Sequence, residues 1–161
     1  MLLLLVAIAI VVSVVIYYQN REVPLVNVTH MPYITNIFKQ TEENPYFRKV
    51  LFTGARSQLV VMSIPPGGEV GEETHAHVEQ TLFFLSGIGK AVLDGKESSI
   101  GAGDVVVVTP GTKHNFLNTG SVPLKIYTLY APPNHIDGRI HVTKEDADKD
   151  VQDEAYGEAV K

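Results

Sequence analysis

The sequence has 161 residues, of which 45% are hydrophobic, and a formal net charge of −5, so it is long enough for one domain with a packed core. It contains no cysteine, which excludes both a disulfide framework and a cysteine-based zinc site. Its lysines and arginines form no dense basic stripe, whereas nucleic-acid binding needs a clustered positive surface. We therefore expect no nucleic-acid partner.

The chain begins with an apolar segment, and we interpret residues 1–19 as a transmembrane helix. Residues 1–18 carry no charged side chain, and a helix of that length spans about 27 Å, close to the thickness of a bilayer core. Tyr17 and Tyr18 stand where an aromatic belt at the membrane surface is expected. A cleaved signal peptide is the main alternative, but its basic start and small-residue cleavage site are both missing.

Residues 20–32 contain two prolines and mixed polarity, and we interpret them as a linker. Arg21 and Lys39 follow the apolar segment, and no basic residue precedes it. Because basic residues favour the cytoplasmic side of a membrane, we expect a single-pass membrane protein whose C-terminal domain lies in the cytoplasm.

Residues 33–142 have the pattern of one all-β domain, apart from an extended piece and one turn expected within residues 31–44. Short runs rich in β-branched and aromatic residues alternate with turn signals, and Asp94-Gly95 is typical of a tight hairpin. No segment between the runs has room for a crossover helix, so the pattern predicts an antiparallel sandwich or barrel. Residues 143–161 are charged and poor in large apolar side chains, and we expect a frayed helix or a disordered tail there.

Three of the six histidines form a pattern typical of a metal site. His75 and His77 are two residues apart, and in an extended strand such residues point to the same face. His114 joins them if a barrel brings its strand close. Imidazoles suit zinc, iron and nickel, and carboxylate or amide oxygens shift the preference toward manganese or iron. A His-X-His pair alone is common without a metal, and we expect His135 and His141 to face solvent.

Two longer motifs surround these histidines. The first comprises Gly68, His75, His77, Gln80 and Gly87, and the second comprises Gly103, Pro110, Gly111, His114 and Asn118. With these motifs the sequence resembles the cupin superfamily, and in particular its small single-domain type-2 members of the mannose-6-phosphate-isomerase-like group. The resemblance implies a single antiparallel cupin β-barrel, of the double-stranded β-helix or jelly-roll type, over residues 33–142.

The resemblance also implies that one divalent metal ion is held by His75, His77, Gln80 and His114. Gln80 stands where the family usually has a carboxylate, and it follows His77 one residue sooner than in the common pattern. A regular strand would place Glu79 on the same face as the histidines, whereas a kink after His77 would return Gln80 to the metal. We favour the kink, which leaves Glu79 at the rim as the candidate catalytic acid or base.

Three functional hypotheses follow from the resemblance and from the metal-type residues. In the first, the protein is a metal-dependent isomerase or related cupin enzyme that acts on a small polar substrate such as a sugar or sugar phosphate. In the second, it is a non-catalytic module that binds a small ligand or metal at a membrane. In the third, it is an interaction domain, for example a dimer whose barrels pack through edge strands. Cupins commonly pair, so we expect a homodimer under all three hypotheses.

Overall fold

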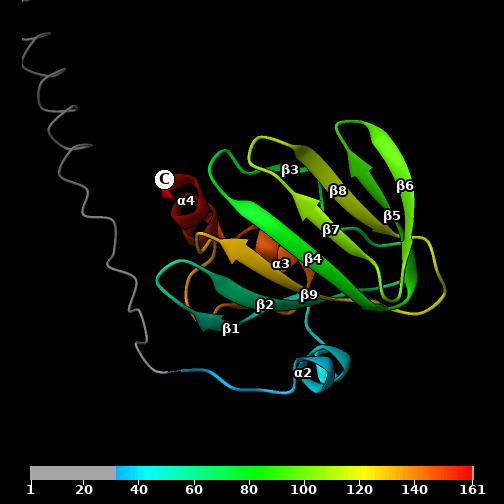
Figure 1. Ribbon diagram of the computed structural model, residues 1–161, viewed down its shortest axis with the longest axis horizontal. Coiled ribbons are helices and arrows are strands. Elements are labelled where there is room, and N and C mark those ends of the chain that lie inside the picture. Colours follow the sequence, from blue (N-terminus) through cyan, green and yellow to red (C-terminus); the bar gives the residue numbers. More distant parts are fainter. Residues whose placement is uncertain (1–31, 161) are drawn as a thin grey trace, which may run out of the picture.

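The computed structural model describes residues 32–160, in which two antiparallel sheets pack face to face (Figure 1). The strands are β1 (Arg48–Thr53), β2 (Gln58–Ile64), β3 (Glu73–Thr74), β4 (Glu79–Ser86), β5 (Ile88–Leu93), β6 (Lys96–Gly101), β7 (Val105–Val108), β8 (Lys113–Asn118), β9 (Leu124–Ala131) and β10 (Ile140–His141). The larger sheet has the order β10-β1-β2-β9-β4-β7, and the smaller has the order β3-β8-β5-β6. The expected antiparallel β architecture is confirmed.

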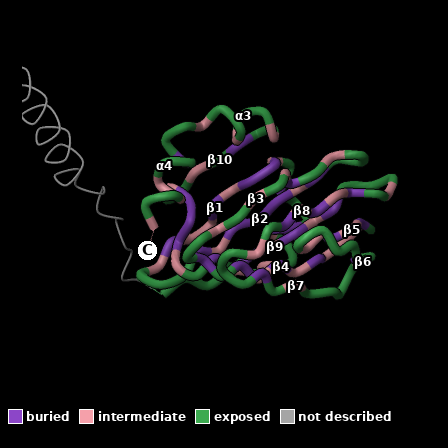
Figure 2. Tube along the Cα trace, turned by 90° about the horizontal axis from the view of Figure 1, so that it is seen from above, coloured by how far each residue is buried: buried purple, intermediate pink, exposed green. Residues whose placement is uncertain are grey.

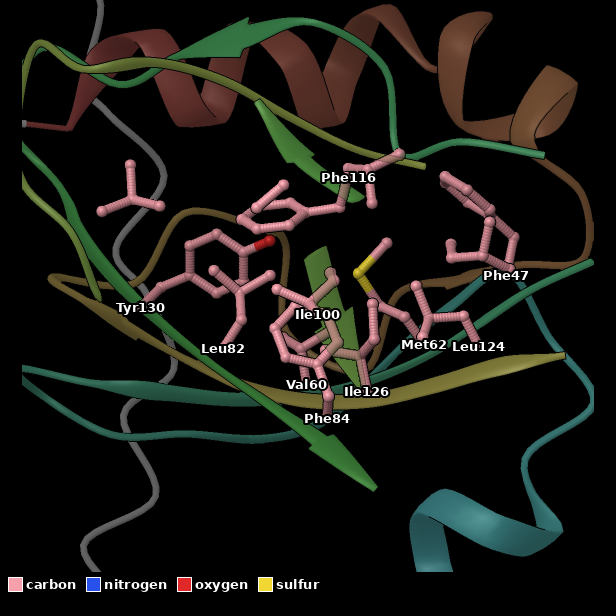
Figure 3. Close-up of a cluster of buried hydrophobic side chains, with 14 of the residues drawn as sticks. Phe47, Val60, Met62, Leu82, Phe84, Ile100, Phe116, Leu124, Ile126 and Tyr130 are labelled. Atoms are coloured by element: carbon pink, nitrogen blue, oxygen red, sulfur yellow. The ribbon is translucent and has the colours of Figure 1, made fainter. Parts of the chain in front are cut away.

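The hydrophobic core lies between the two sheets, where side chains from alternate strand positions meet (Figure 3). In β4, Gln80, Leu82 and Phe84 are buried and the residues between them are less so, as expected when one face of a strand packs inward. The same alternation is visible along the strands in Figure 2. Phe84 of the larger sheet contacts Phe116 of the smaller, with ring centroids 5.7 Å apart. Burying one such ring contributes roughly 2–3 kcal/mol by removing apolar surface from water.

Two of the predicted turn signals show why those residues are needed. Asp94 and Gly95 have φ angles of 47° and 77° and close the β5–β6 hairpin, as predicted. Gly87, between β4 and β5, has a φ angle of 89°, and a Cβ there would lie 2.8 Å from the carbonyl oxygen of Pro123. Both the backbone conformation and the close approach therefore require glycine at this position.

Helix α2 (Ile37–Glu43) takes the place of the extended piece and turn expected within residues 31–44. The side chain of Asn36 caps the helix by accepting a 3.1 Å hydrogen bond from the backbone N–H of Lys39. The ring of Phe38 lies 6.1 Å from that of Tyr127 in β9, which docks the helix on the larger sheet. The helix cap and this aromatic contact thus stabilise the helical conformation of a segment whose polarity pattern alone predicts no single structure.

Residues 143–161 were expected to form either a frayed helix or a disordered tail, and the described part of this segment contains two short helices, so it is the helical alternative that the structure resembles. The helices are α3 (Lys144–Asp148) and α4 (Val151–Ala159). Thr143 and Asp146 form a capping box at the start of α3, and Asp150 caps α4 by accepting from the backbone N–H of Asp153. The side chain of Asp153 is itself buried. Local caps and one buried polar contact therefore order a segment that has little apolar surface.

No helix within residues 32–160 is long and apolar enough to cross a membrane. The transmembrane helix expected at residues 1–19 lies outside the described residues, as does nearly all of the linker expected at residues 20–32. The described part of the chain corresponds to the expected β domain and the charged segment that follows it.

Candidate metal centre

Three side chains that can ligate a metal, Glu73, His75 and His114, meet beside β3. One ligand atom from each lies within 4.8 Å of the other two. Glu73 in β3 is the direct cross-strand partner of His114 in β8, so the register of these strands places a carboxylate beside an imidazole. His75 follows Glu73 by two residues, which keeps its side chain on the same side of the extended chain.

The carboxylate of Glu73 lies close to both imidazoles. Its Oε2 is 3.5 Å from Nε2 of His75 and 3.9 Å from Nε2 of His114, while Nη2 of Arg48 donates a 3.3 Å hydrogen bond to its Oε1. Burial by itself would raise the pKa of Glu73, but the contact with His75 and the charge of Arg48 outweigh it and lower the pKa to about 2. Glu73 is therefore an anion at neutral pH, the form that binds a cation.

His114 presents a nitrogen that fits a metal ion. Its Nδ1 lies 2.9 Å from the carbonyl oxygen of Thr112, which can only accept, so Nδ1 carries the proton and Nε2 the lone pair of the neutral ring. Burial lowers the pKa of His114, which favours this neutral form. The Nε2 atoms of His75 and His114 are both buried and have no hydrogen-bond partner. Two such nitrogens beside one carboxylate fit a divalent cation.

His77 and Gln80, the other two residues predicted as ligands, are not part of this cluster. The chain bends at Ala76 and His77, and His77 is exposed. After the bend, Gln80 lies on the inward face of β4, and neither polar atom of its amide has a hydrogen-bond partner. Glu79 is exposed on the outward face. A kink was expected after His77, and the bend lies at Ala76 and His77; in the strand that follows, Gln80 faces inward and Glu79 outward. The metal-binding roles of His77 and Gln80 and the catalytic role of Glu79 stay predictions.

Tyr130 brings a further polar atom to this region. It is the cross-strand partner of Gln80, and its ring centroid lies 6.0 Å from that of His75. Figure 3 shows its ring and hydroxyl among the core side chains. Burial raises the pKa of Tyr130, so the hydroxyl stays protonated, and its oxygen has no hydrogen-bond partner. Polar groups with unused hydrogen-bonding capacity thus extend from the histidines into the core.

Two histidines that were expected to face solvent are buried instead. His135, in the loop after β9, is 5% exposed, and its Nδ1 forms a 2.7 Å hydrogen bond with Oδ2 of Asp153 in α4. His141 in β10 is 3% exposed and lies 3.0 Å from a carboxylate oxygen of Asp150. The expectation was wrong because the helices after β10 fold back over this loop, which no local pattern in the sequence reveals.

A cavity of about 520 Å³ opens between the cluster and the C-terminal helices. Arg48 lies in its wall and bridges two carboxylates, with Nη2 3.3 Å from Glu73 and Nη1 3.9 Å from Asp153. The rest of the lining comes from residues 73–78, the loop after β9, α3 and α4. A cavity of this size suits a small organic ligand.

Comparison with known proteins identifies the family. The model of the cupin domain family matches residues 60–130. The chain is 39% identical over 137 residues to the uncharacterized protein YrkC of Bacillus subtilis, a match that covers 81% of this chain and 73% of the relative. This chain belongs to the cupin family. A crystal structure of a Bacillus halodurans protein is similar to this cupin with a TM-score of 0.72 and 35% identity, covering 74% of this chain and 95% of that one.

One further relative of this cupin carries a functional name. The oxalate-binding protein of Thermotoga maritima is 36% identical to it over 68 residues, which cover 42% of this chain and 56% of the relative. The shared segment is less than half of the chain, so the similarity concerns a part of the domain.

Glu73 is the cluster residue that the sequence reasoning missed. The period-two argument that pairs His75 with His77 also pairs Glu73 with His75, and it applies to the residues before the bend. This cupin has an amide at Gln80, where the family usually has a carboxylate. The structure shows that Glu73 supplies a carboxylate to the same cluster from a different strand. A search for carboxylates at even spacing on both sides of His75 would have found it.

Proposed function

We propose that this cupin holds one divalent metal ion through Glu73, His75 and His114 and binds a small polar ligand in the adjoining cavity. The observation that carries the proposal is a pair of buried Nε2 atoms, on His75 and His114, that have no hydrogen bond and lie 3.5 and 3.9 Å from the carboxylate of Glu73. Gln80, with its inward amide, is the next candidate ligand, and the exposed His77 ranks after it. A bound divalent ion would supply a Lewis acid that polarises an oxygen of the ligand.

The number of unpaired polar atoms in this region supports a binding role. Leaving a buried polar group without a hydrogen bond costs roughly 1–3 kcal/mol, so folded proteins keep few of them. Five such atoms belong to four neighbouring residues here: Nε2 of His75, Nε2 of His114, both amide atoms of Gln80 and the hydroxyl oxygen of Tyr130. Their concentration at one cluster indicates that the site is built to contact something other than the protein itself.

Binding is favoured over catalysis by the position of Glu79. A metal-dependent isomerase acting on a sugar or sugar phosphate needs an acid or base beside the ion. Glu79, the residue predicted for that role, is exposed on the outward face of β4. A protein that binds a small ligand needs no such group, and one relative is named as an oxalate-binding protein.

A second candidate function is ligand binding without a metal. The ion pair between Arg48 and Glu73 favours it, because Arg48 already compensates the buried carboxylate that a metal would neutralise. Under either function we carry two further proposals from the sequence: attachment to a membrane through residues 1–19, with the domain in the cytoplasm, and a homodimer.

The metal proposal is tested by measuring metal content by mass spectrometry. The full chain is loaded separately with manganese, iron, nickel and zinc salts and then desalted. We expect close to one ion per chain in the parent and loss of the ion in Glu73→Gln and His114→Ala. Glu72→Gln is the matched control, because it removes an exposed carboxylate next to Glu73 that lies outside the cluster. Absence of metal in the parent would contradict the metal-binding function and leave the metal-free one.

A further inference from the structure

The part of the cavity wall formed by α3 and α4 is acidic. The carboxylates that line the cavity are Glu73, Asp148, Asp153, Glu154 and Glu158, and among the described residues the one lysine or arginine in the lining is Arg48. Arg48 is already engaged by two of these carboxylates, and Asp148 is paired with Lys144 at 2.8 Å. Glu154 and Glu158, one turn apart on α4, are exposed and have no cationic partner within residues 32–160.

This charge distribution works against an anionic ligand. Away from the metal, a carboxylate or phosphate group is bound most strongly by a guanidinium or ammonium group, and within residues 32–160 the two such groups beside the cavity, Arg48 and Lys144, are already paired. A dianion that approaches a metal at the Glu73 cluster would also meet the uncompensated charges of Glu154 and Glu158. At physiological salt, two such charges are expected to weaken the binding of a dianion by about threefold to tenfold.

His135 lies in the loop after β9 and also lines the cavity, and one nitrogen of its ring has no hydrogen-bond partner. Its backbone N–H and carbonyl are both bound by the side chain of Gln58, at 2.9 and 2.7 Å, and its Nδ1 is held by Asp153 at 2.7 Å. Burial and the charge of Arg48 outweigh Asp153 and lower the pKa of His135 to about 4, so the ring is neutral. Nδ1 then donates to Asp153, and the lone pair lies on Nε2, which is buried without a partner.

We propose that this wall selects a ligand that carries hydrogen-bond donors and no negative charge, with Nε2 of His135 accepting from its hydroxyl or amino group. The inference rests on the proposed function, in which a metal at the Glu73 cluster holds another part of the same ligand. Asp153 is a positioning residue, because it fixes the tautomer and the orientation of the His135 ring. Dicarboxylates such as oxalate, and phosphate esters, are disfavoured at this site.

The charge selection is tested by calorimetry on the metal-loaded full chain with four probes: ethanolamine, mannose, oxalate and inorganic phosphate. We expect ethanolamine or mannose to bind more tightly than either anion. The double variant E154Q/E158Q should tighten oxalate binding by about threefold to tenfold and leave mannose binding unchanged. E42Q/E43Q is the matched control, because it removes two exposed charges from α2, which does not line the cavity.

The role of His135 is tested by His135→Asn. The asparagine amide can still donate to Asp153 from the position of Nδ1, while the acceptor at Nε2 is lost. We expect affinity for ethanolamine to fall at least tenfold while metal content stays at the parent level. Should the variant not fold, the ¹⁵N shift of His135 Nε2 in the zinc-loaded parent, with and without ethanolamine, gives the same information, and an unchanged shift counts against the contact.

Tighter binding of oxalate or phosphate, or no measurable binding of ethanolamine and mannose, would overturn the inference. Metal content is measured on the same samples, so failure of the proposed function is seen separately. If the parent holds no metal, the metal-binding function fails, and the ranking of the four probes on the metal-free cavity still decides whether the wall rejects anions.

Discussion

Glu73 in β3 and His114 in β8 are direct cross-strand partners, although they lie far apart in the sequence. The pairing puts the carboxylate Oε2 3.9 Å from Nε2 of His114, and His75 reaches the same carboxylate from the end of β3. A two-residue strand therefore decides the geometry of the cluster, because its register with β8 sets which side chains face one another.

A bound metal should stabilise the fold. We expect the free energy of unfolding to rise by about 2.7 kcal/mol at a metal concentration one hundred times the dissociation constant, because the ion binds the folded chain only. Urea denaturation of the full chain with and without the metal measures this rise. The rise should vanish in Glu73→Gln and persist in Glu79→Gln, which removes a carboxylate from the outward face of β4. An equal rise in Glu73→Gln would contradict the assigned cluster.

The stability of the metal-free protein should fall between pH 6.5 and pH 4 because of His135. Its pKa is lowered to about 4 in the folded state, mainly by burial and then by Arg48, against about 6.5 in the unfolded chain. Within this window the unfolded chain binds a proton that the folded chain does not, so stability is lost as the pH falls. The loss amounts to about 3 kcal/mol over the whole window.

The pH effect is isolated by comparing the parent with His135→Asn in urea denaturation at several pH values, with a chelator present. Contributions to the pH dependence from groups that the two proteins share cancel in the difference between them. The parent should lose more stability than the variant as the pH falls from 6.5 to 4, and the two should have parallel profiles above pH 7. Parallel profiles over the whole range would show that His135 is not held neutral.

Replacing Asp153 by alanine should destabilise the fold by about 3–5 kcal/mol. Its carboxylate accepts 2.7 Å hydrogen bonds from His135 and from the backbone N–H of Ile136, and it lies 3.9 Å from Arg48. Removing it leaves these three donors buried and partly unpaired. Asp137→Ala, at an exposed carboxylate of the same loop, should change stability by less than about 0.5 kcal/mol in the same denaturation experiment. Similar losses in the two variants would argue against a structural role for the contact.

The stability of the fold should depend on the polarity of the Gln58 side chain as much as on its size. Its amide is fully buried and bonds to Thr53 at 2.8 Å and to the backbone of Asn134 and His135. Gln58→Leu preserves much of the volume but leaves those backbone groups unsatisfied, so we expect a loss of about 2–4 kcal/mol by thermal or urea unfolding. Gln152→Leu on the exposed side of α4 serves as the control. A loss no larger than the control's would refute this account.

Asn118 is the last residue of the second motif. Its side chain should contribute to the stability of the fold and not to metal binding. Its side-chain amide donates to the carbonyl oxygens of Ile64 and Val122 and accepts from the backbone N–H of Gly120. Asn118→Ala should lower the free energy of unfolding by about 1–3 kcal/mol and leave metal content unchanged. The exposed Thr119→Ala should lower it by much less. Loss of metal in a folded Asn118→Ala protein would contradict this separation of roles.

The sequence by itself determined the β architecture and two of the three cluster residues, His75 and His114. Alternating apolar residues and turn signals act locally, so they predicted the antiparallel strands, and Asp94-Gly95 predicted a hairpin that the structure confirms. The positions of His75 and His114 in the two motifs likewise predicted that both residues belong to the metal site, and in the structure they lie together. The expected membrane segment at residues 1–19 and the role of Glu79 stay predictions.

The tertiary structure alone decided which carboxylate joins the histidines and what lies opposite them. The bend at Ala76 and His77 removes His77 from the cluster and turns Gln80 inward, while the register of β3 with β8 supplies Glu73. His135 is buried because α4 folds back over its loop and offers Asp153 as a partner. These contacts join residues that are distant along the chain. Local propensity carries no information about them, because it is the packing of the two sheets and the C-terminal helices that brings them together.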